Sequence, residues 1–228
     1  MTWRLSGPLA LALTLFCWTA QVIHASETET VAERAQKAFD SIRSMKAGFK
    51  QVFENKGFGQ SAQLRGTVYI LKPARMLWVY DEPKGRILAA DGESLWFYDP
   101  AENVAYHDEI KGLLSEKSPA LFLAGEKTLS GLFTIDLVKL GKMDKLNDVV
   151  RLKLTPKSPH PGVKAMLLTL DASSFDIVEL LMVDHLGNKN RISFFNEDQG
   201  FVPDESIFAF TPPEGAPVRS MKGRAPVQ

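Results

Sequence analysis

Short segments in which apolar and polar residues alternate follow one another along most of the chain. A period of two residues is typical of strands that bury one face of a sheet. Turn sequences such as "DGE", "DPAEN", "SPHPG" and "HLGNKN" lie between the segments, which predicts antiparallel hairpins in one large curled sheet. The predicted strands are "FKQVFE", "GTVYILK", "MLWVY", "RILAAD", "SLWFYD", "NVAYHD", "FTIDLVKL", "VVRLKL", "AMLLTLD", "IVELLMVD" and "NRISFF".

The segment that leads into the first of these strands has a different period. In "TETVAERAQKAFDSIRSMKAGF", residues 28–49, apolar residues recur at intervals of three and four, and acidic residues stand near the start. This spacing predicts one amphipathic helix. Its apolar face consists of Val31, Ala35, Ala38, Phe39, Ile42 and Met45.

Residues 112–133 also lose the period of two. Ser118 followed by Pro119 is a favourable cap and first turn, so short helices are predicted here. Two interpretations are open: a helical plug that closes one end of a barrel, and a lid that can leave. The apolar side chains of this segment are Leu113, Leu114, Leu121, Phe122, Leu123, Leu129, Leu132 and Phe133.

One predicted strand is apolar on both faces. In "KPARMLWVYDEP", Met76, Trp78 and Tyr80 share one face, while Leu77 and Val79 point to the other. A sheet that packs against a single core needs only one apolar face. The second face therefore meets either another part of the chain or an apolar ligand. From the residue alone, Trp78 fits an ordinary core tryptophan as well as a cavity wall.

Residues 1–25 are predicted to be a secretory signal peptide, with Arg4 before the apolar run "LALALTLFCWTA" and Ala25 before the cleavage point. The run is short for a membrane span, and a signal anchor is the alternative. The only cysteine, Cys17, follows Phe16 instead of the small residue that lipoprotein acylation requires, so we assign it to the signal. The mature chain then contains no cysteine and depends on its own burial.

The remaining residues, 26–228, are predicted to form a single domain. The chain of 228 residues is 45% hydrophobic and 24% charged, which is ordinary for a globular protein with a sizeable core. The sequence has no Ser- or Gly-rich linker, repeat or low-complexity tract. Only the Pro-rich ending "TPPEGAPVRSMKGRAPVQ" is predicted to be a loosely held tail.

The charge balance and the reactive side chains favour neither a nucleic-acid-binding protein nor an enzyme. Basic and acidic residues balance at 27 each, without a basic stripe for phosphates, so no nucleic-acid partner is expected. Outside the signal the histidines are His107, His160 and His185, none at a metal-ligand spacing from another. Motifs for a serine nucleophile or a bound nucleotide are missing. We therefore expect no catalytic residue, no metal and no cofactor.

Four sequence blocks together resemble a known family. They are residues 66–100, "GTVYILKPARMLWVYDEPKGRILAADGESLWFYDP", with "FKQVFE" before it and "SPALFLAG" and "FAFTPPEGA" after it. In this order they are similar to the periplasmic outer-membrane lipoprotein carriers, the LolA family. The resemblance implies a mainly β protein: an unclosed, strongly curved antiparallel half-barrel covered by a lid of short α-helices. Its inner face would hold the acyl chains of a lipoprotein.

The resemblance also assigns candidate residues. Trp78 matches the tryptophan of the family's signature, and Met76 stands where the family has an aromatic residue. Lys72 replaces an arginine that is thought to hold the lid by hydrogen bonds to backbone, so Lys72, or Arg75 in its place, is the expected lid gate. The expected cavity wall consists of Phe49, Met76, Trp78, Tyr80, Leu121, Phe122 and Leu123, the last three from the lid helix.

The function that the resemblance implies is lipid transport without an enzymatic step. An acyl chain in water is unfavourable by about 0.8 kcal/mol per methylene, so a carrier needs an apolar pocket. We expect a monomer in the periplasm of a Gram-negative bacterium that takes acylated lipoproteins from an inner-membrane ABC exporter to an outer-membrane receptor. Alternatives are a half-barrel carrier or sensor for another lipid, such as a glycolipid or hopanoid, a sensor of mislocalised lipoprotein, and an acyl-ester hydrolase.

Overall fold

The computed structural model describes residues 13–110, 128–138, 148–160 and 162–221, with side chains described from Glu27 onwards. Its strands form one 12-stranded sheet in the order β12-β6-β5-β4-β3-β2-β1-β11-β10-β9-β8-β7. The strands are β1 (Ser44–Asn55), β2 (Gln60–Leu71), β3 (Arg75–Tyr80), β4 (Ile87–Asp91), β5 (Ser94–Asp99), β6 (Val104–Glu109), β7 (Phe133–Leu137), β8 (Val149–Pro156), β9 (Ala165–Asp171), β10 (Ile177–Val183), β11 (Lys189–Asp198) and β12 (Val218–Ser220). The helices are α1 (Leu13–Ser41), α4 (Leu129–Leu132) and the 3-10 helix η1 (Glu205–Phe208).

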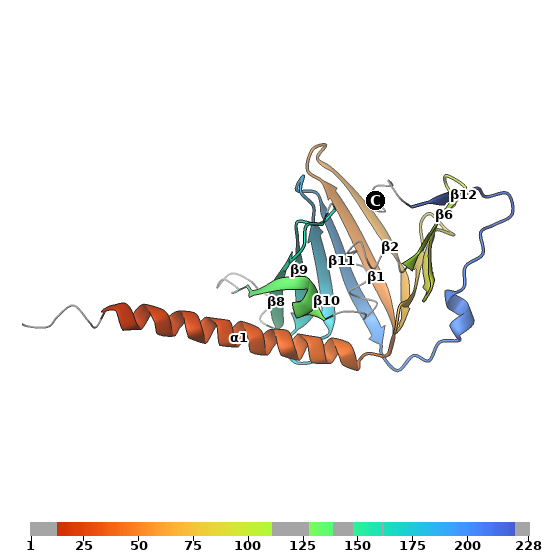
Figure 1. Cartoon of the computed structure of the whole chain (residues 1–228). Helices are drawn as coiled ribbons and strands as arrows, with labels where there is room; N and C mark the ends of the chain where they lie inside the picture. Colours follow the sequence, from red (N-terminus) through yellow and green to blue (C-terminus); the bar gives the residue numbers. More distant parts are fainter. Residues whose placement is uncertain (1–12, 111–127, 139–147, 161, 222–228) are drawn as a thin grey trace, which may run out of the picture.

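The sheet is strongly curved and does not close on itself, because its two edges are β12 and β7 (Figure 1). Every strand predicted from the alternating pattern is present, as β1 to β11, and neighbouring strands among these pair antiparallel. The predicted unclosed antiparallel half-barrel is therefore confirmed. The segment predicted to form a helical lid spans residues 112–133, of which residues 112–127 lie outside the described residues. In the described part of this segment, α4 is a single short helix.

The first helix differs from its prediction at its C-terminal end. The predicted helix ran to residue 49, but α1 ends at Ser41 and residues from Ser44 belong to β1. Met45, Ala47 and Phe49 are all buried on one face of that strand. The prediction was wrong here because β1 pairs along its length with β2 and β11, and these non-local bonds outweigh local helix propensity.

The inner face of the sheet, which carries Met76, Trp78 and Tyr80, forms one buried apolar cluster with the C-terminal half of α1. In Figure 1, α1 runs along the end of the sheet at which β1 begins, and its N-terminal half extends beyond the sheet. Ala35 and Phe39 are the buried residues that α1 contributes to the cluster. Among the residues that the structure describes, none of the helices is both long enough and apolar enough to span a membrane.

The C-terminal segment covers the outer face of β3 to β5. This contact explains why β3 is apolar on both faces. Phe208 of η1 is buried, and the ring of Phe210 lies 5.9 Å from Trp96 and 6.0 Å from Tyr98, between ring centroids. Further along, β12 pairs parallel with β6, and the amide of Ala105 donates to the carbonyl of Pro217 at 3.0 Å. Part of the segment expected to be loose thus covers what would otherwise be an open sheet edge.

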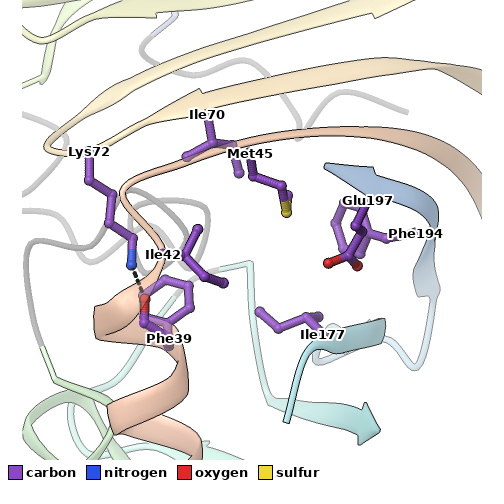
Figure 2. Close-up of a pocket in the computed structure, with 8 residues that line it drawn as sticks. All are labelled: Phe39, Ile42, Met45, Ile70, Lys72, Ile177, Phe194 and Glu197. Atoms are coloured by element: carbon purple, nitrogen blue, oxygen red, sulfur yellow. Dashed lines mark hydrogen bonds between the residues drawn. The ribbon is translucent and has the colours of Figure 1, made fainter. Parts of the chain in front are cut away.

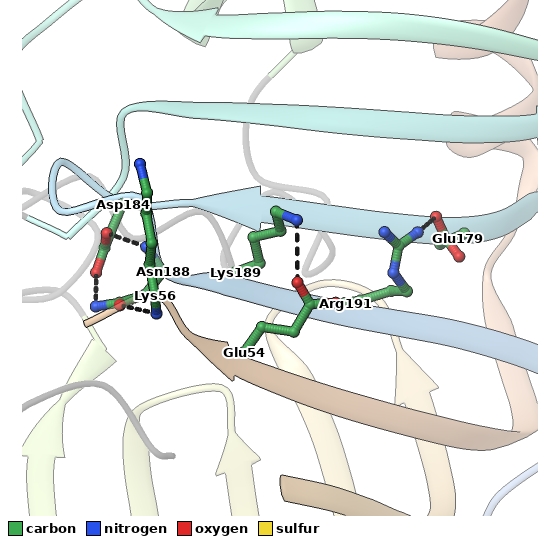
Figure 3. Close-up of polar contacts among 7 residues, drawn as sticks. All are labelled: Glu54, Lys56, Glu179, Asp184, Asn188, Lys189 and Arg191. Atoms are coloured by element: carbon green, nitrogen blue, oxygen red, sulfur yellow. Dashed lines mark hydrogen bonds and ion pairs between the residues drawn. The ribbon is translucent and has the colours of Figure 1, made fainter. Parts of the chain in front are cut away.

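Two adjacent hairpins, β1–β2 and β10–β11, are joined at their tips by polar contacts (Figure 3). The backbone amide of Lys56 donates to Asn188 Oδ1 at 3.0 Å, and Lys189 Nζ lies 3.0 Å from Glu54 Oε2. Asn188 is itself positioned by Asp184, which accepts from its backbone and side-chain nitrogens, each at 2.8 Å. These contacts connect the tips of the two hairpins beside the paired strands β1 and β11.

Candidate functional site

Aromatic side chains form the centre of the inner face. Phe49 of β1 is completely buried, and its ring meets Trp78 and Tyr80 of β3 edge-on, with centroids 4.8 and 5.2 Å apart. β2 lies between these strands, and its residue at this level is Gly66. A Cβ there would be 2.0 Å from the Val79 carbonyl oxygen and 2.8 Å from the Phe49 ring, so glycine allows the aromatic rings to meet across β2.

The structure brings together the expected wall residues that it describes: Phe49, Met76, Trp78 and Tyr80 all lie buried on the inner face. The period of two along β3 was sufficient to place three of them on one face. The other expected wall residues, Leu121, Phe122 and Leu123, lie outside the described residues. That these side chains contact an acyl chain stays a prediction.

An apolar pocket continues the inner face towards the end of α1 (Figure 2). Figure 2 shows Phe39 of α1, and Ile42 directly after the helix, opposite side chains from the sheet. Its wall is mostly aliphatic and aromatic, which suits a hydrocarbon chain and offers little to a polar ligand. The lining residues are Phe39, Ile42, Met45, Ile70, Lys72, Ile177, Phe194 and Glu197. Apart from Lys72, sequence reasoning did not identify them, although alternation in β1 and β2 could have selected Met45 and Ile70.

Lys72 holds the last turn of α1 against the sheet. Its Nζ donates to the Phe39 carbonyl oxygen and lies 3.5 Å from the centroid of the Phe39 ring, while its backbone amide donates to the Arg43 carbonyl at 2.9 Å. Burial lowers the pKa of Lys72, and the nearby Asp40 carboxylate partly opposes this shift. A cation at the C-terminal end of a helix is favourable because the last carbonyls lack partners within the helix.

The expected gate residues are not together in the structure. Lys72 does bind a backbone carbonyl, as the resemblance implies, but the acceptor belongs to α1; residues 119–123 lie outside the described residues. Arg75 points to the outer face, where its guanidinium is 3.4 Å from Glu205 of η1. Arg75 therefore fastens the C-terminal segment and does not reach the pocket. A gate role for either residue stays a prediction.

The inner face becomes polar at the end opposite α1. The Tyr80 hydroxyl donates to Gln51 Oε1 at 3.3 Å, and Gln51 Nε2 donates to Asn190 Oδ1 at 3.1 Å. Burial raises the pKa of Tyr80 to about 12, with the Arg86 guanidinium partly opposing the shift. Tyr80 is therefore neutral at physiological pH and keeps its proton for the hydrogen bond. Sequence reasoning missed Gln51 and Asn190 because this chain of bonds joins strands far apart in sequence.

His107 is not part of this site. It lies on the outer face, with its ring centroid 4.2 Å from that of Trp96 and Nε2 3.1 Å from Ser94 Oγ. Within the described ranges, no cluster of three His, Cys, Asp or Glu side chains is arranged to hold a metal ion. What the inner face offers is therefore a surface for binding an apolar molecule, with a polar end.

Comparison with known proteins identifies the family. A sequence model of the family described as "Outer membrane lipoprotein carrier protein LolA" matches residues 40–211. The chain belongs to the LolA family. Among its LolA-family relatives, one from Methylococcus capsulatus, named outer-membrane lipoprotein carrier protein, is 30% identical over 209 residues that cover 91% of this chain and 95% of the relative. Another of the same name, from Chromobacterium violaceum, is 29% identical over 214 residues, covering 93% and 98% of the two chains.

A solved structure is similar to this chain in its fold. An uncharacterized conserved protein from Thermus thermophilus superposes with a TM-score of 0.52 at 12% identity and covers 85% of this LolA-family chain and 99% of its own. The match to the family also confirms the resemblance noted from the sequence blocks, since residues 40–211 contain the first three of them and the start of "FAFTPPEGA".

Proposed function

We propose that this LolA-family protein binds the acyl chains of lipoproteins on its inner face and carries them through the periplasm. The observation that supports this most directly is the apolar pocket between α1 and the sheet, which continues from the aromatic wall of Phe49, Trp78 and Phe194. Each methylene removed from water stabilises the complex by about 0.8 kcal/mol, so such a surface favours binding of an acyl chain.

Loading and release must be controlled by opening of the half-barrel. The apolar side chains of α1 occupy part of the inner face, so a bound chain competes with them, and the cost of opening reduces the net affinity. The wall would be completed by Leu121, Phe122 and Leu123. We infer that an inner-membrane ABC exporter supplies the energy for loading and that an outer-membrane receptor takes the cargo, with residues 1–25 removed during export.

The test uses two neighbouring residues of β10. Ile177 lines the pocket, whereas Val178 is exposed and does not line it. Because a carboxylate in an apolar pocket opposes hydrocarbon binding, we expect Ile177→Glu to abolish formation of a soluble complex with a triacylated lipoprotein, while Val178→Glu retains it. Complex formation is measured by release of lipoprotein from spheroplasts and by mass spectrometry of lipids extracted from the purified protein.

Circular dichroism of both variants controls for folding. If folded Ile177→Glu protein releases lipoprotein as the parent does, the pocket is not the acyl site. If the extract contains a glycolipid or hopanoid instead of lipoprotein, the half-barrel carries a different cargo.

A further inference from the structure

The indole N–H of Trp78 is a buried hydrogen-bond donor on the inner face of the sheet. Trp78 is only 5% exposed, and within the described part of the chain its Nε1 has no hydrogen-bond partner. Buried polar groups in folded proteins are nearly always paired, and leaving a donor unpaired is unfavourable. A donor of this kind on an apolar surface is available to an acceptor that a ligand brings.

The position of this donor relative to the pocket is informative. Trp78 contacts Phe194, whose ring centroid is 6.1 Å away, and Phe194 also lines the pocket beside α1. On its other side along β3 is Tyr80, which begins the hydrogen-bonded chain to Gln51 and Asn190. Trp78 therefore lies between the apolar and the polar parts of the inner face.

Polar side chains also stand on the inner face of β1 and β11, which lie beyond β2 from β3. Along β1, Gln51 lies between Phe49 and Phe53, and along β11 the order is Phe194, Ile192 and Asn190 in the same direction across the sheet. In β3 the order is Met76, Trp78 and Tyr80. A molecule with a hydrocarbon tail and a polar end fits this surface in one orientation.

We propose that Trp78 Nε1 donates a hydrogen bond to the carbonyl oxygen of an ester-linked acyl chain. The hydrocarbon then extends towards the pocket under α1, and the polar end of the lipid lies by Gln51, Tyr80 and Asn190. This inference rests on the proposed acyl-binding function and adds a specificity to it: the protein selects acyl esters over other hydrocarbons. The carbonyl is the one good acceptor that an acyl chain brings into an apolar site.

Two lipids of equal chain length test this selection: monopalmitoylglycerol, which has an ester carbonyl, and the monohexadecyl ether of glycerol, which has none. Because only the ester supplies a carbonyl acceptor to the buried donor, we expect the parent protein to bind it about tenfold more tightly. Trp78→Phe removes the donor but keeps an aromatic ring, and should bind both lipids with equal affinity. Trp96→Phe, on the outer face, should retain the preference.

A second measurement on the parent protein does not depend on the affinity of any variant. In a proton–nitrogen correlation spectrum, the indole resonance that is missing from Trp78→Phe should move downfield with the ester and stay in place with the ether, as expected for a new hydrogen bond. Equal affinities of the parent for the two lipids, or an ester preference that survives in folded Trp78→Phe, would overturn the inference while leaving acyl binding intact. Failure of the parent to bind either lipid would contradict the proposed function itself.

Discussion

Tyr80 is the residue at which the apolar and polar parts of the inner face meet. Its ring packs against Phe49, and its hydroxyl donates to Gln51. Since the folded protein raises the pKa of Tyr80 to about 12 from its ordinary value of 10.0, the neutral phenol is favoured by folding. The resulting stabilisation of the folded protein is fully present below the pKa that Tyr80 has in the unfolded chain. It is lost as the pH rises through the pKa that Tyr80 has in the folded protein.

This gives a prediction for alkaline unfolding. Between pH 10 and pH 12 the parent should lose about 2–3 kcal/mol of unfolding free energy through Tyr80, as expected for a shift of two pKa units. Tyr80→Phe lacks the ionisable group, so its stability should fall less steeply over that range. Urea unfolding of both proteins at several pH values measures the difference. If the unfolding free energies of Tyr80→Phe and the parent fall in parallel with pH, folding does not raise the pKa of Tyr80.

At the scale of elements, the contact between Lys72 and α1 connects β2 and β3 to the helix that borders the pocket. The Lys72 ammonium caps the last turn of α1 through the Phe39 carbonyl. In a molecule that alternates between closed and open states, this bond favours the closed state. Its strength should therefore influence both the order of the helix end and the retention of cargo.

Lys72→Met removes the donor but keeps an unbranched apolar side chain. A hydrogen bond from a charged donor contributes about 1.5–3 kcal/mol, so we expect a loss of that size in unfolding free energy and faster hydrogen exchange at the end of α1. Because opening becomes easier, cargo should bind more tightly and transfer to outer membranes more slowly. Lys72→Arg keeps a donor and should exchange slowly, and Lys84→Met, at an exposed position, should change stability by less than about 0.5 kcal/mol.

Unchanged exchange at the end of α1 in Lys72→Met would show that the helix is held by its apolar contacts alone. Cargo transfer at the parental rate would remove Lys72 as a gate. Since Arg75 is engaged with Glu205 on the outer face, the search for a gate would then move to the apolar residues of α1 itself.

At the scale of the whole molecule, α1 joins the core through its C-terminal half. Among the helix side chains that the structure describes, from Glu27 onwards, Val31 is the first that packs against the buried cluster, and Arg34 lies over the ring of Phe175 at 4.2 Å. The N-terminal half of the helix projects beyond the sheet in Figure 1. The helix side chains that the structure places in the core, among those it describes, thus all follow the predicted cleavage point.

We expect the periplasmic protein to begin at or near Ser26 and to unfold at the same temperature as the chain that retains residues 1–25. The physical reason is that, among the helix side chains that the structure describes, those that enter the core all follow the cleavage point. N-terminal sequencing and thermal unfolding of both forms measure this. An acylated Cys17 in the membrane fraction would contradict cleavage at this point and indicate a membrane-bound receptor, and a lower unfolding temperature of the shorter form would show that the removed residues stabilise the fold.

The sequence by itself determined the strands and the faces of the sheet. Alternation of side chains between faces is a property of each strand, so it placed Met76, Trp78 and Tyr80 together without any knowledge of their neighbours. Turn sequences separated the strands for the same local reason. The family was also recognisable from the sequence, because its blocks occur in order along the chain.

Only the tertiary structure decided which distant segments meet. The extension of β1 back to Ser44 required pairing with β2 and β11, and the acceptor of Lys72 required the end of α1 to lie beside β2. The pocket combines residues from α1, β10 and β11, and the C-terminal segment covers the outer face. Such contacts could not be derived from local patterns, because they depend on strand register and on the curvature of the complete sheet, which are set by all strands together.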